Sequence, residues 1–294
     1  MNNPSTLIHI GYPKAASTLL QHYFSTHPNV YYSGDLLGNY KFSGEIQIPH
    51  IALTTGQTHL VVSEEQLSVW QGNLDIVGVK FKPYDVAAQQ QKTAQQLHIR
   101  FPGAKILIVT RGFQSALQSM YSQYVSIGGI LKFEEFEQQF GSILSAFYNY
   151  DYVIYTYRSI FGAGNVLVLP FEMLRHQPKD FINRINQFGG LPEIDFEVSV
   201  KNASLGNEEV ESYRKLSWVW YKTISWLPYK AQQALYGLYV YMLYTRKLSK
   251  VTGLFSSKVE PIQVSDSTLA LFTGKAEALR GETLYHPYWK EYLL

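Results

Sequence analysis

The sequence predicts an α/β fold in which a central parallel sheet lies between two layers of helices. Short apolar runs occur at 7–10, 60–62, 76–79, 106–110 and 166–169. Continuous apolar runs, rather than alternating ones, are typical of strands that are buried on both faces of a parallel sheet. Helix-like stretches separate these runs, and this alternation favours one doubly wound sheet over separate all-α and all-β parts.

The elements can be assigned in chain order. The run from Leu7 to Ile10 ends at Gly11, and a helical pattern follows from Thr18 to Phe24, which indicates a strand, a tight loop and a helix. The other helix candidates are 85–99, 113–127, 133–160 and 179–188. From Glu208 onward the pattern is helix-like and rich in aromatic residues, without clear strands.

Length, charge and composition limit the classes of protein to consider. The 294 residues fit one α/β domain, with a core over 1–205 and a helical cap or extension of the same domain over 206–294. The net charge is only +2, so we expect no nucleic-acid partner, and any anion site must be local. The absence of cysteine excludes disulfides and thiolate chemistry. The first residues contain no basic segment before an apolar run, so we expect no signal peptide and a cytoplasmic location.

The loop at 11–18, GYPKAAST, follows the first predicted strand, where parallel sheets bind their ligands. Its N–H groups and the helix N-terminus favour an anion, Lys14 adds a positive charge, and Ser17 and Thr18 add hydroxyl donors. We therefore expect a phosphate or sulfate group here. The ordinary P-loop has its lysine at the end of the loop, so this order does not fit an ATPase or GTPase. The alternative is a solvated Lys14 with hydroxyls that only cap the helix.

A second turn from strand to helix carries Arg111 at the strand end and Ser119 two helical turns later, so both can face one site. A guanidinium that donates two hydrogen bonds, with a supporting hydroxyl, suits a phosphate monoester. Taken alone, this turn also has a purely structural explanation, in which Arg111 pairs with a carboxylate and Ser119 lies on the helix surface. Two phosphate sites in one chain indicate a nucleotide with phosphates at both ends.

The segment GYPKAASTLLQHYFSTHP at 11–28 resembles the 5′-phosphosulfate-binding segment of sulfotransferases that use 3′-phosphoadenosine 5′-phosphosulfate (PAPS). The resemblance implies that Lys14 contacts the bridging and sulfuryl oxygens and helps the leaving phosphate to depart. It also implies a 5′-phosphate site at Ala15, Ala16, Ser17 and Thr18. Ala16 departs from the family pattern, because many members have glycine there.

In the same family an arginine at a strand end and a serine eight residues later hold the 3′-phosphate, and Arg111 and Ser119 have this spacing. The resemblance covers about 7–205. It implies a P-loop-like three-layer sandwich, a nucleotide-binding core, and sulfuryl transfer to an acceptor hydroxyl with no metal. Segments 62–65 and 201–205 also resemble bacterial members, the latter with Asn202 beside the nucleotide. Their alternatives are a helix N-terminus and a polar loop.

A general base near the acceptor hydroxyl assists such a transfer. The segment from His27 to Asp35 is similar to one in tyrosylprotein and heparan-type sulfotransferases, where a glutamate follows the histidine by about eight residues. This similarity implies that Asp35 is the base, although Gly34-Asp35 also fits an exposed turn. The other candidate bases are Glu45, His50 and Glu64. Lys82, in a Lys-Pro-Tyr turn, resembles a family lysine that contacts the transferring group, or is a solvated turn residue.

The stretch at 214–248 combines Trp and Tyr with Lys and Arg. Its longest uncharged part, 231–245, is shorter than the roughly 20 residues of a spanning helix, so we expect no membrane crossing. Peripheral contact with a membrane, an acceptor groove and a packed helix pair all fit this composition. A glycan or lipid-linked acceptor is favoured, a small molecule stays open, and the oligomeric state is undetermined.

Two other classes of protein share part of this pattern. A P-loop-like kinase of a nucleoside or small molecule would bind similar phosphates, but the sequence lacks GxxxxGK[ST]. A non-catalytic nucleotide-binding module would keep the phosphate sites and lose transfer. The presence of both Lys14 and Asp35 counts against such a module.

Overall fold

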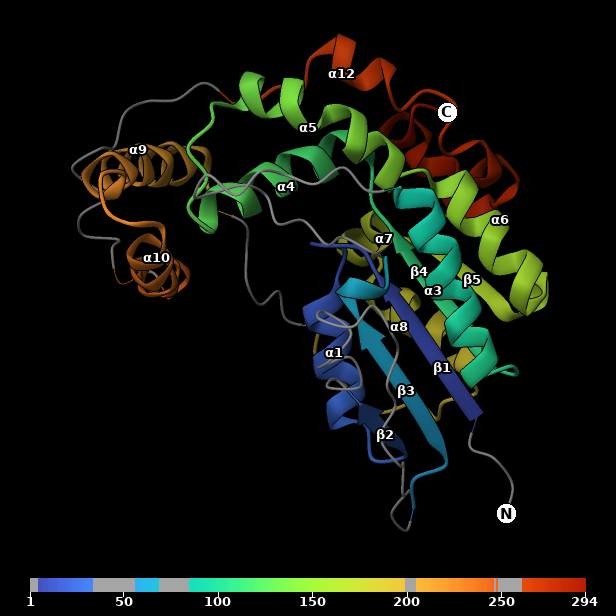
Figure 1. Cartoon of the computed structure of the whole chain (residues 1–294). Helices are drawn as coiled ribbons and strands as arrows, with labels where there is room; N and C mark the ends of the chain where they lie inside the picture. Colours follow the sequence, from blue (N-terminus) through green and yellow to red (C-terminus); the bar gives the residue numbers. More distant parts are fainter. Residues whose placement is uncertain (1–4, 34–55, 69–84, 199–204, 246, 248–260) are drawn as a thin grey trace.

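A computed structural model describes residues 5–33, 56–68, 85–198, 205–245, 247 and 261–294 (Figure 1). Its centre is a five-stranded parallel sheet in the order β2-β3-β1-β4-β5. The strands are β1 (Ser5–Gly11), β2 (Val30–Ser33), β3 (His59–Glu64), β4 (Lys105–Thr110) and β5 (Val166–Pro170).

Four of the apolar runs correspond to β1, β3, β4 and β5, which confirms the predicted parallel sheet. The run at 76–79 lies outside the described residues. β2 gives no comparable sequence signal, because it has four residues, of which only Val30 is buried.

Helices cover both faces of the sheet, with α1 and α8 on one face and α3 and α6 on the other (Figure 1). The helices are α1 (Ser17–Thr26), α3 (Val86–Arg100), α4 (Phe113–Ser126), α5 (Phe133–Phe147), α6 (Tyr150–Phe161), α7 (Phe171–His176), α8 (Pro178–Gly189), α9 (Asn207–Ile224), α10 (Tyr229–Tyr244) and α12 (Asp266–Ala270). The 3₁₀ segments of the described residues are η1 (Glu65–Ser68), η2 (Ala163–Asn165), η4 (Glu277–Gly281) and η5 (Thr283–Tyr292). The described helices are too short or too polar to cross a membrane.

The prediction of one helix over 133–160 is wrong, because this stretch forms α5 and α6. The chain leaves the helical path at Tyr148, and Asn149 caps the new helix by accepting a hydrogen bond from the Tyr152 N–H at 3.2 Å. Asparagine is favoured at this position because its side chain satisfies a free N–H of the first turn. The break allows the Tyr150 ring to enter the core, where it is fully buried.

The C-terminal 3₁₀ segment η5 returns to the centre of the molecule. The Thr110 hydroxyl, at the end of β4, forms hydrogen bonds with the hydroxyls of Tyr285 at 2.7 Å and Tyr292 at 2.9 Å. The Tyr292 hydroxyl donates a further bond to the Glu172 carboxylate at 2.8 Å. All four residues are buried, so the last residues of the chain form part of the main core.

This packing predicts the effect of Tyr292→Phe. The substitution keeps the ring but leaves buried oxygens of Thr110 and Glu172 with one partner fewer, so we expect it to lower the free energy of unfolding by about 1 to 3 kcal/mol. Urea denaturation measures this change. The matched control is Tyr288→Phe, because the Tyr288 hydroxyl bonds to no residue in the described part of the chain. Equal losses in both variants would contradict the prediction.

Candidate functional site

The carboxyl ends of β3, β1 and β4 meet at one edge of the sheet. In the strand register, Ile10 pairs with Glu64 and Gly11 pairs with Val109. The chain runs from β1 to one side of the sheet and later crosses to β4 on the other side, which creates a switch point between them. Open α/β sheets bind ligands in the crevice at such a point.

The loop after β1 is compact and held by its own hydrogen bonds. The Ala15 N–H donates to the Tyr12 carbonyl at 3.1 Å, and the Ser17 hydroxyl donates to the same oxygen at 3.3 Å. Glycine at position 11 allows this loop conformation, because a methyl group there would lie 2.7 Å from the Ser17 hydroxyl oxygen. Any side chain at Gly11 would therefore displace the Ser17 hydroxyl from its present position.

Lys14 and Ala16 both have positive φ angles, of 61° and 66°. Ala16 is the N-cap of α1 and supplies no side-chain hydrogen bond to the helix. The first N–H groups of α1 thus lack a partner from a capping side chain, and an anion can satisfy them. Among the predicted hydroxyl donors, Thr18 is exposed, whereas Ser17 is buried and turned toward the loop backbone.

The Arg111 side chain connects this loop with the turn after β4. Its Nη1 donates to the Lys14 carbonyl at 2.7 Å, and its Nε donates to the Ser115 hydroxyl at 3.0 Å. The guanidinium also lies over the Phe171 ring, 4.9 Å from its centre. These bonds use two of the five N–H donors of an arginine, which leaves donors for an anion. The structure therefore brings Lys14 and Arg111 together.

Buried side chains fix the backbone at Arg111 by hydrogen bonds. The Tyr150 hydroxyl accepts from the Arg111 N–H at 3.0 Å and donates to the Arg111 carbonyl at 2.7 Å. The next N–H, of Gly112, donates to the Glu172 carboxylate at 2.9 Å. The Tyr150 ring also contacts the Tyr12 ring edge-on, with centres 5.4 Å apart. The loop after β1 and the turn after β4 thus share one aromatic support.

Ser119 lies one turn beyond Ser115 on α4, so both side chains occupy the same face of the helix. Ser119 is 4% exposed, and its hydroxyl has no hydrogen-bond partner among the described residues. An unpaired buried hydroxyl is costly, and a bound acceptor would remove that cost. Ser119 therefore lies in the middle of α4, on the same face as the Ser115 hydroxyl that accepts from Arg111.

The electrostatics of the site favour a bound anion. Burial lowers the pKa of the Lys14 ammonium, an effect that Glu65 opposes and the Arg111 charge reinforces. Burial also raises the pKa of the Glu65 carboxyl, against the influence of Ser17 and Lys14. The partly buried Lys14 and the buried Arg111 thus carry two positive charges, whereas the nearby Glu65 carboxyl is harder to ionise than usual. A dianionic ligand would offset this excess of positive charge.

Glu65 and His9 belong to this region but give little signal in the sequence. His9 is fully buried in β1, its Nδ1 lies 2.7 Å from the Ser63 hydroxyl, and burial lowers its pKa to about 3. It is therefore neutral near pH 7. Glu65 directly follows β3. In the sequence, only its position as an acidic residue after an apolar run indicates that it could belong to the site. Glu64, one of the candidate bases, ends β3 and is partly buried.

Several predicted site residues lie outside the described residues. They are Asp35, Glu45, His50, Lys82 and Asn202.

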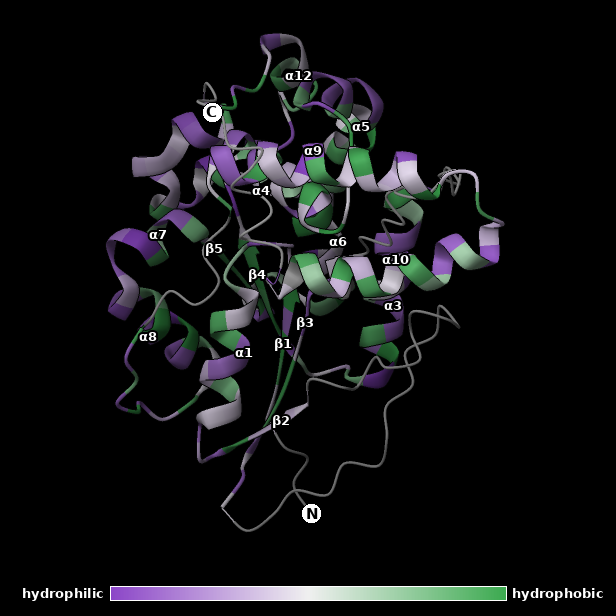
Figure 2. Cartoon of the chain, turned by 90° about the vertical axis from the view of Figure 1, so that its left-hand side faces the viewer, coloured by the Kyte–Doolittle hydropathy of each residue, from purple (hydrophilic) through white to green (hydrophobic). Residues whose placement is uncertain are grey.

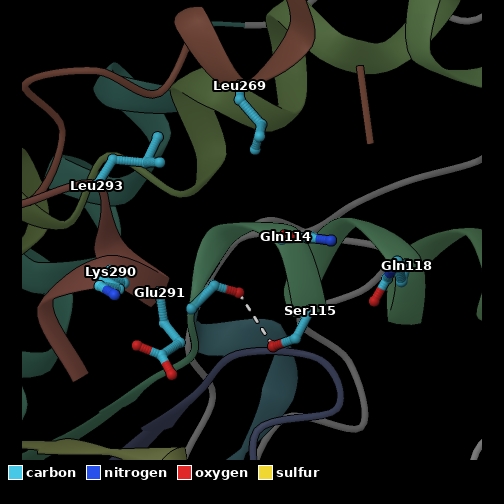
Figure 3. A pocket seen from close by; sticks show the side chains of 8 residues that line it. Gln114, Ser115, Gln118, Leu269, Lys290, Glu291 and Leu293 are labelled. Atoms are coloured by element: carbon cyan, nitrogen blue, oxygen red, sulfur yellow. Dashed lines mark hydrogen bonds between the residues drawn. The ribbon is translucent and has the colours of Figure 1, made fainter. Parts of the chain in front are cut away.

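A pocket of about 310 Å³ opens where the first turns of α4 meet α12 and η5 (Figure 3). Gln114, Gln118 and Lys290 contribute polar groups to its wall, and the Ser115 hydroxyl donates to the Gly112 carbonyl at 3.1 Å. Lys14, Arg111 and Ser119 do not line this pocket. The pocket adjoins the Arg111 turn through Gly112 and Ser115, because Ser115 also accepts the hydrogen bond from Arg111.

The fold defines a P-loop-like α/β protein in which the turns that carry Lys14 and Arg111 meet at the tips of β1 and β4. Residues 4–219 match the family model described as a sulfotransferase domain, so the chain belongs to this family. A solved structure, a sulfotransferase from Alicyclobacillus acidocaldarius, aligns with a TM-score of 0.50 and 18% identity. The alignment covers 79% of this chain and 100% of that chain, and it shows a shared fold. The comparison with curated proteins gives no match.

The left-handed conformation of Ala16 predicts the effect of Ala16→Gly. Glycine adopts positive φ without the steric cost of a Cβ, but it also has more freedom in the unfolded chain. We expect the free energy of unfolding to stay within about 0.5 kcal/mol or to rise by up to about 1 kcal/mol. Thermal or urea unfolding measures the change.

The matched control makes the same substitution in a helix. Ala234 is exposed in the interior of α10, where Ala234→Gly should lower the free energy of unfolding by about 0.5 to 1 kcal/mol. A comparable loss in Ala16→Gly would show that the conformation of Ala16 carries no strain.

Proposed function

We propose that this sulfotransferase takes its sulfuryl group from PAPS and transfers it to an acceptor hydroxyl. The observation that carries the proposal is the hydrogen bond from Arg111 to the Lys14 carbonyl, at 2.7 Å. It joins two cationic turns at neighbouring strand tips, where a nucleotide with phosphates at both ends would meet a positive group at each end. The unpaired, buried Ser119 hydroxyl adds a donor on the Arg111 side.

In the proposed binding mode, the loop after β1 holds the 5′-phosphosulfate and the turn after β4 holds the 3′-phosphate. The free N–H groups at the start of α1 and the Thr18 hydroxyl would bind the 5′-phosphate. The Ala15 N–H is already bonded to Tyr12, so Ala15 would contribute through the shape of the loop. Arg111 and Ser119 would bind the 3′-phosphate, and Asn202 would lie beside the nucleotide.

The proposed reaction is an in-line displacement at sulfur. The acceptor oxygen forms a bond to sulfur while the bond between sulfur and the bridging phosphate oxygen breaks, which releases 3′,5′-bisphosphoadenosine. Lys14 stabilises the negative charge that develops on the leaving phosphate, and Lys82 contacts the transferring group. Asp35 takes the proton of the acceptor hydroxyl. The proposal requires no metal ion.

The proposed acceptor is a hydroxyl of a glycan or a lipid-linked molecule, in the cytoplasm or at the inner face of its membrane. The aromatic and basic stretch at 214–248 favours an acceptor near a lipid surface over one that is free in solution. A kinase of a small molecule is the main rival, and its requirement for Mg²⁺ with ATP separates the two functions by experiment.

Calorimetry of nucleotide binding tests the proposal and its rival together. We expect wild-type protein to bind 3′,5′-bisphosphoadenosine without Mg²⁺. Arg111→Ala should weaken this binding by about 1.5 to 3 kcal/mol, because a charged hydrogen-bonding partner is lost. Arg184→Ala, an exposed arginine of α8, is the matched control and should bind normally. Preference for ATP with Mg²⁺ would instead favour the kinase.

Turnover with labelled PAPS separates the catalytic groups from those that only bind. We expect Lys14→Ala to abolish transfer, because the charge on the leaving phosphate is no longer stabilised. Asp35→Asn should keep the affinity for 3′,5′-bisphosphoadenosine and lose rate. The control is Lys92→Ala, on the exposed face of α3. Unchanged turnover in Lys14→Ala would remove Lys14 from the mechanism, and full activity in Asp35→Asn would assign the base elsewhere.

A further inference from the structure

Helices α9 and α10 form a hairpin that packs on α4 beside the end far from Arg111 (Figures 1 and 2). Inside the hairpin, the rings of Trp220 and Tyr239 stack with centres 4.3 Å apart, and the Ser217 and Tyr239 hydroxyls lie 2.8 Å apart. The Tyr236 hydroxyl donates to the carbonyl of Ile127, the C-cap of α4, at 2.8 Å. The hairpin is therefore anchored by specific contacts.

The outer surface of this hairpin is unusually apolar. α10 contains one lysine and no acidic residue, and most of its other residues are aliphatic or aromatic. Helices that are apolar on most sides are normally buried in protein or lipid. The large apolar side chains that the hairpin exposes are Trp218, Val219, Trp226, Tyr229, Leu235, Leu238 and Tyr241. Many large exposed apolar side chains on one pair of helices favour an interaction site.

The start of α9 carries Glu208, Glu209 and Glu211, but the charge of the rest of the hairpin, including its tip, has one sign. From Ser212 to Val259 the sequence contains eight Lys and Arg residues and no Asp or Glu. The nearest acidic residue before it, Glu211, pairs with Arg214 at 2.6 Å. Lys222 lies over the Trp218 ring, and Lys247 lies over the Tyr241 ring. The apolar surface is thus bordered by cations.

These features meet at the tip of the hairpin, between α9 and α10. Trp226 is 78% exposed and Tyr229 is 51% exposed, and exposed Lys222 and Lys230 flank them. The Trp226 indole N–H donates to the Thr223 carbonyl at 2.7 Å, which holds the ring at the tip. Trp and Tyr favour the boundary between headgroups and acyl chains, and lysines beside them attract anionic headgroups.

We propose that the α9–α10 hairpin is a docking surface for an anionic phospholipid bilayer, with Trp226 and Tyr229 inserted at the headgroup level. The 16 residues of α10 extend about 24 Å, less than the hydrocarbon thickness of a bilayer, so the hairpin lies on the membrane and does not cross it. The positive charge around the tip favours anionic lipid over a second copy of the same tip, because two such surfaces would repel each other. This proposal does not depend on the identity of the donor nucleotide.

Co-sedimentation of the full chain with lipid vesicles tests the proposal. We expect binding to vesicles that contain phosphatidylglycerol, weak binding to phosphatidylcholine alone, and loss of binding at high salt. Trp226→Ala combined with Tyr229→Ala should lower the partition coefficient about tenfold. Lys222→Gln combined with Lys230→Gln should lower it by about 25-fold on anionic vesicles and leave binding to phosphatidylcholine unchanged.

Matched controls distinguish binding through this surface from non-specific binding to lipid. Tyr155, 73% exposed on α6, and Ile99, 81% exposed on α3, provide a double alanine variant that removes apolar surface elsewhere. Lys92→Gln with Lys179→Gln removes the same charge from α3 and α8. Both control variants should bind vesicles as the wild type does, and all variants should keep their unfolding transitions and nucleotide affinity.

Three results would overturn the proposal. The first is equal binding to neutral and anionic vesicles, and the second is no binding to either. The third is a dimer in light scattering that Trp226→Ala converts to a monomer, which would assign the surface to self-association. None of these results would affect nucleotide binding or transfer, so they leave the proposed enzymatic function to its own tests.

Discussion

The hydrogen bond between the Arg111 guanidinium and the Lys14 carbonyl joins two turns that are 97 residues apart in the chain. It exists because the strand order sets β1 beside β4, so that both turns leave the sheet at the same edge. The bond also brings two positive charges close together in a partly buried place, where water screens them poorly. The protein alone compensates this repulsion only in part through Glu65, whose pKa is raised by burial. An anionic ligand would complete the compensation.

Support for this arrangement comes from residues far along the chain. Tyr150 holds both polar groups of the Arg111 peptide, and Glu172 holds the next N–H. Glu172 in turn accepts from Tyr292, in the last turn of the protein. The family match ends at residue 219, yet the position of the Arg111 turn depends on a segment beyond it. Sequence drift in that segment would therefore act on the site through packing rather than through contact with a ligand.

The sequence predicts those features that depend on local patterns. Buried parallel strands give apolar runs, and the register of β1 and β4 follows from the fold class, so the meeting of Lys14 and Arg111 was foreseeable. The break at Asn149 was not, because a cap competes there with a continuous helical pattern. The bonds of Thr110 to tyrosines more than 170 residues away leave no local signal. Glu65 is an intermediate case, because the sequence indicates its position at the end of a strand but not its burial.

Helix α4 links the Arg111 turn with the α9–α10 hairpin. Its first turn carries Ser115, which accepts from Arg111, and its far end contacts the hairpin through Ile127. The helix has 14 residues and is about 21 Å long, so it acts as a short, stiff spacer between the crevice and the apolar tip. If the hairpin rests on a bilayer, this spacer sets the height of the crevice above the lipid. An acceptor hydroxyl would then have to lie about that far from the lipid surface, as it can on a lipid-linked glycan that diffuses laterally, whereas a freely soluble acceptor would gain nothing from the hairpin.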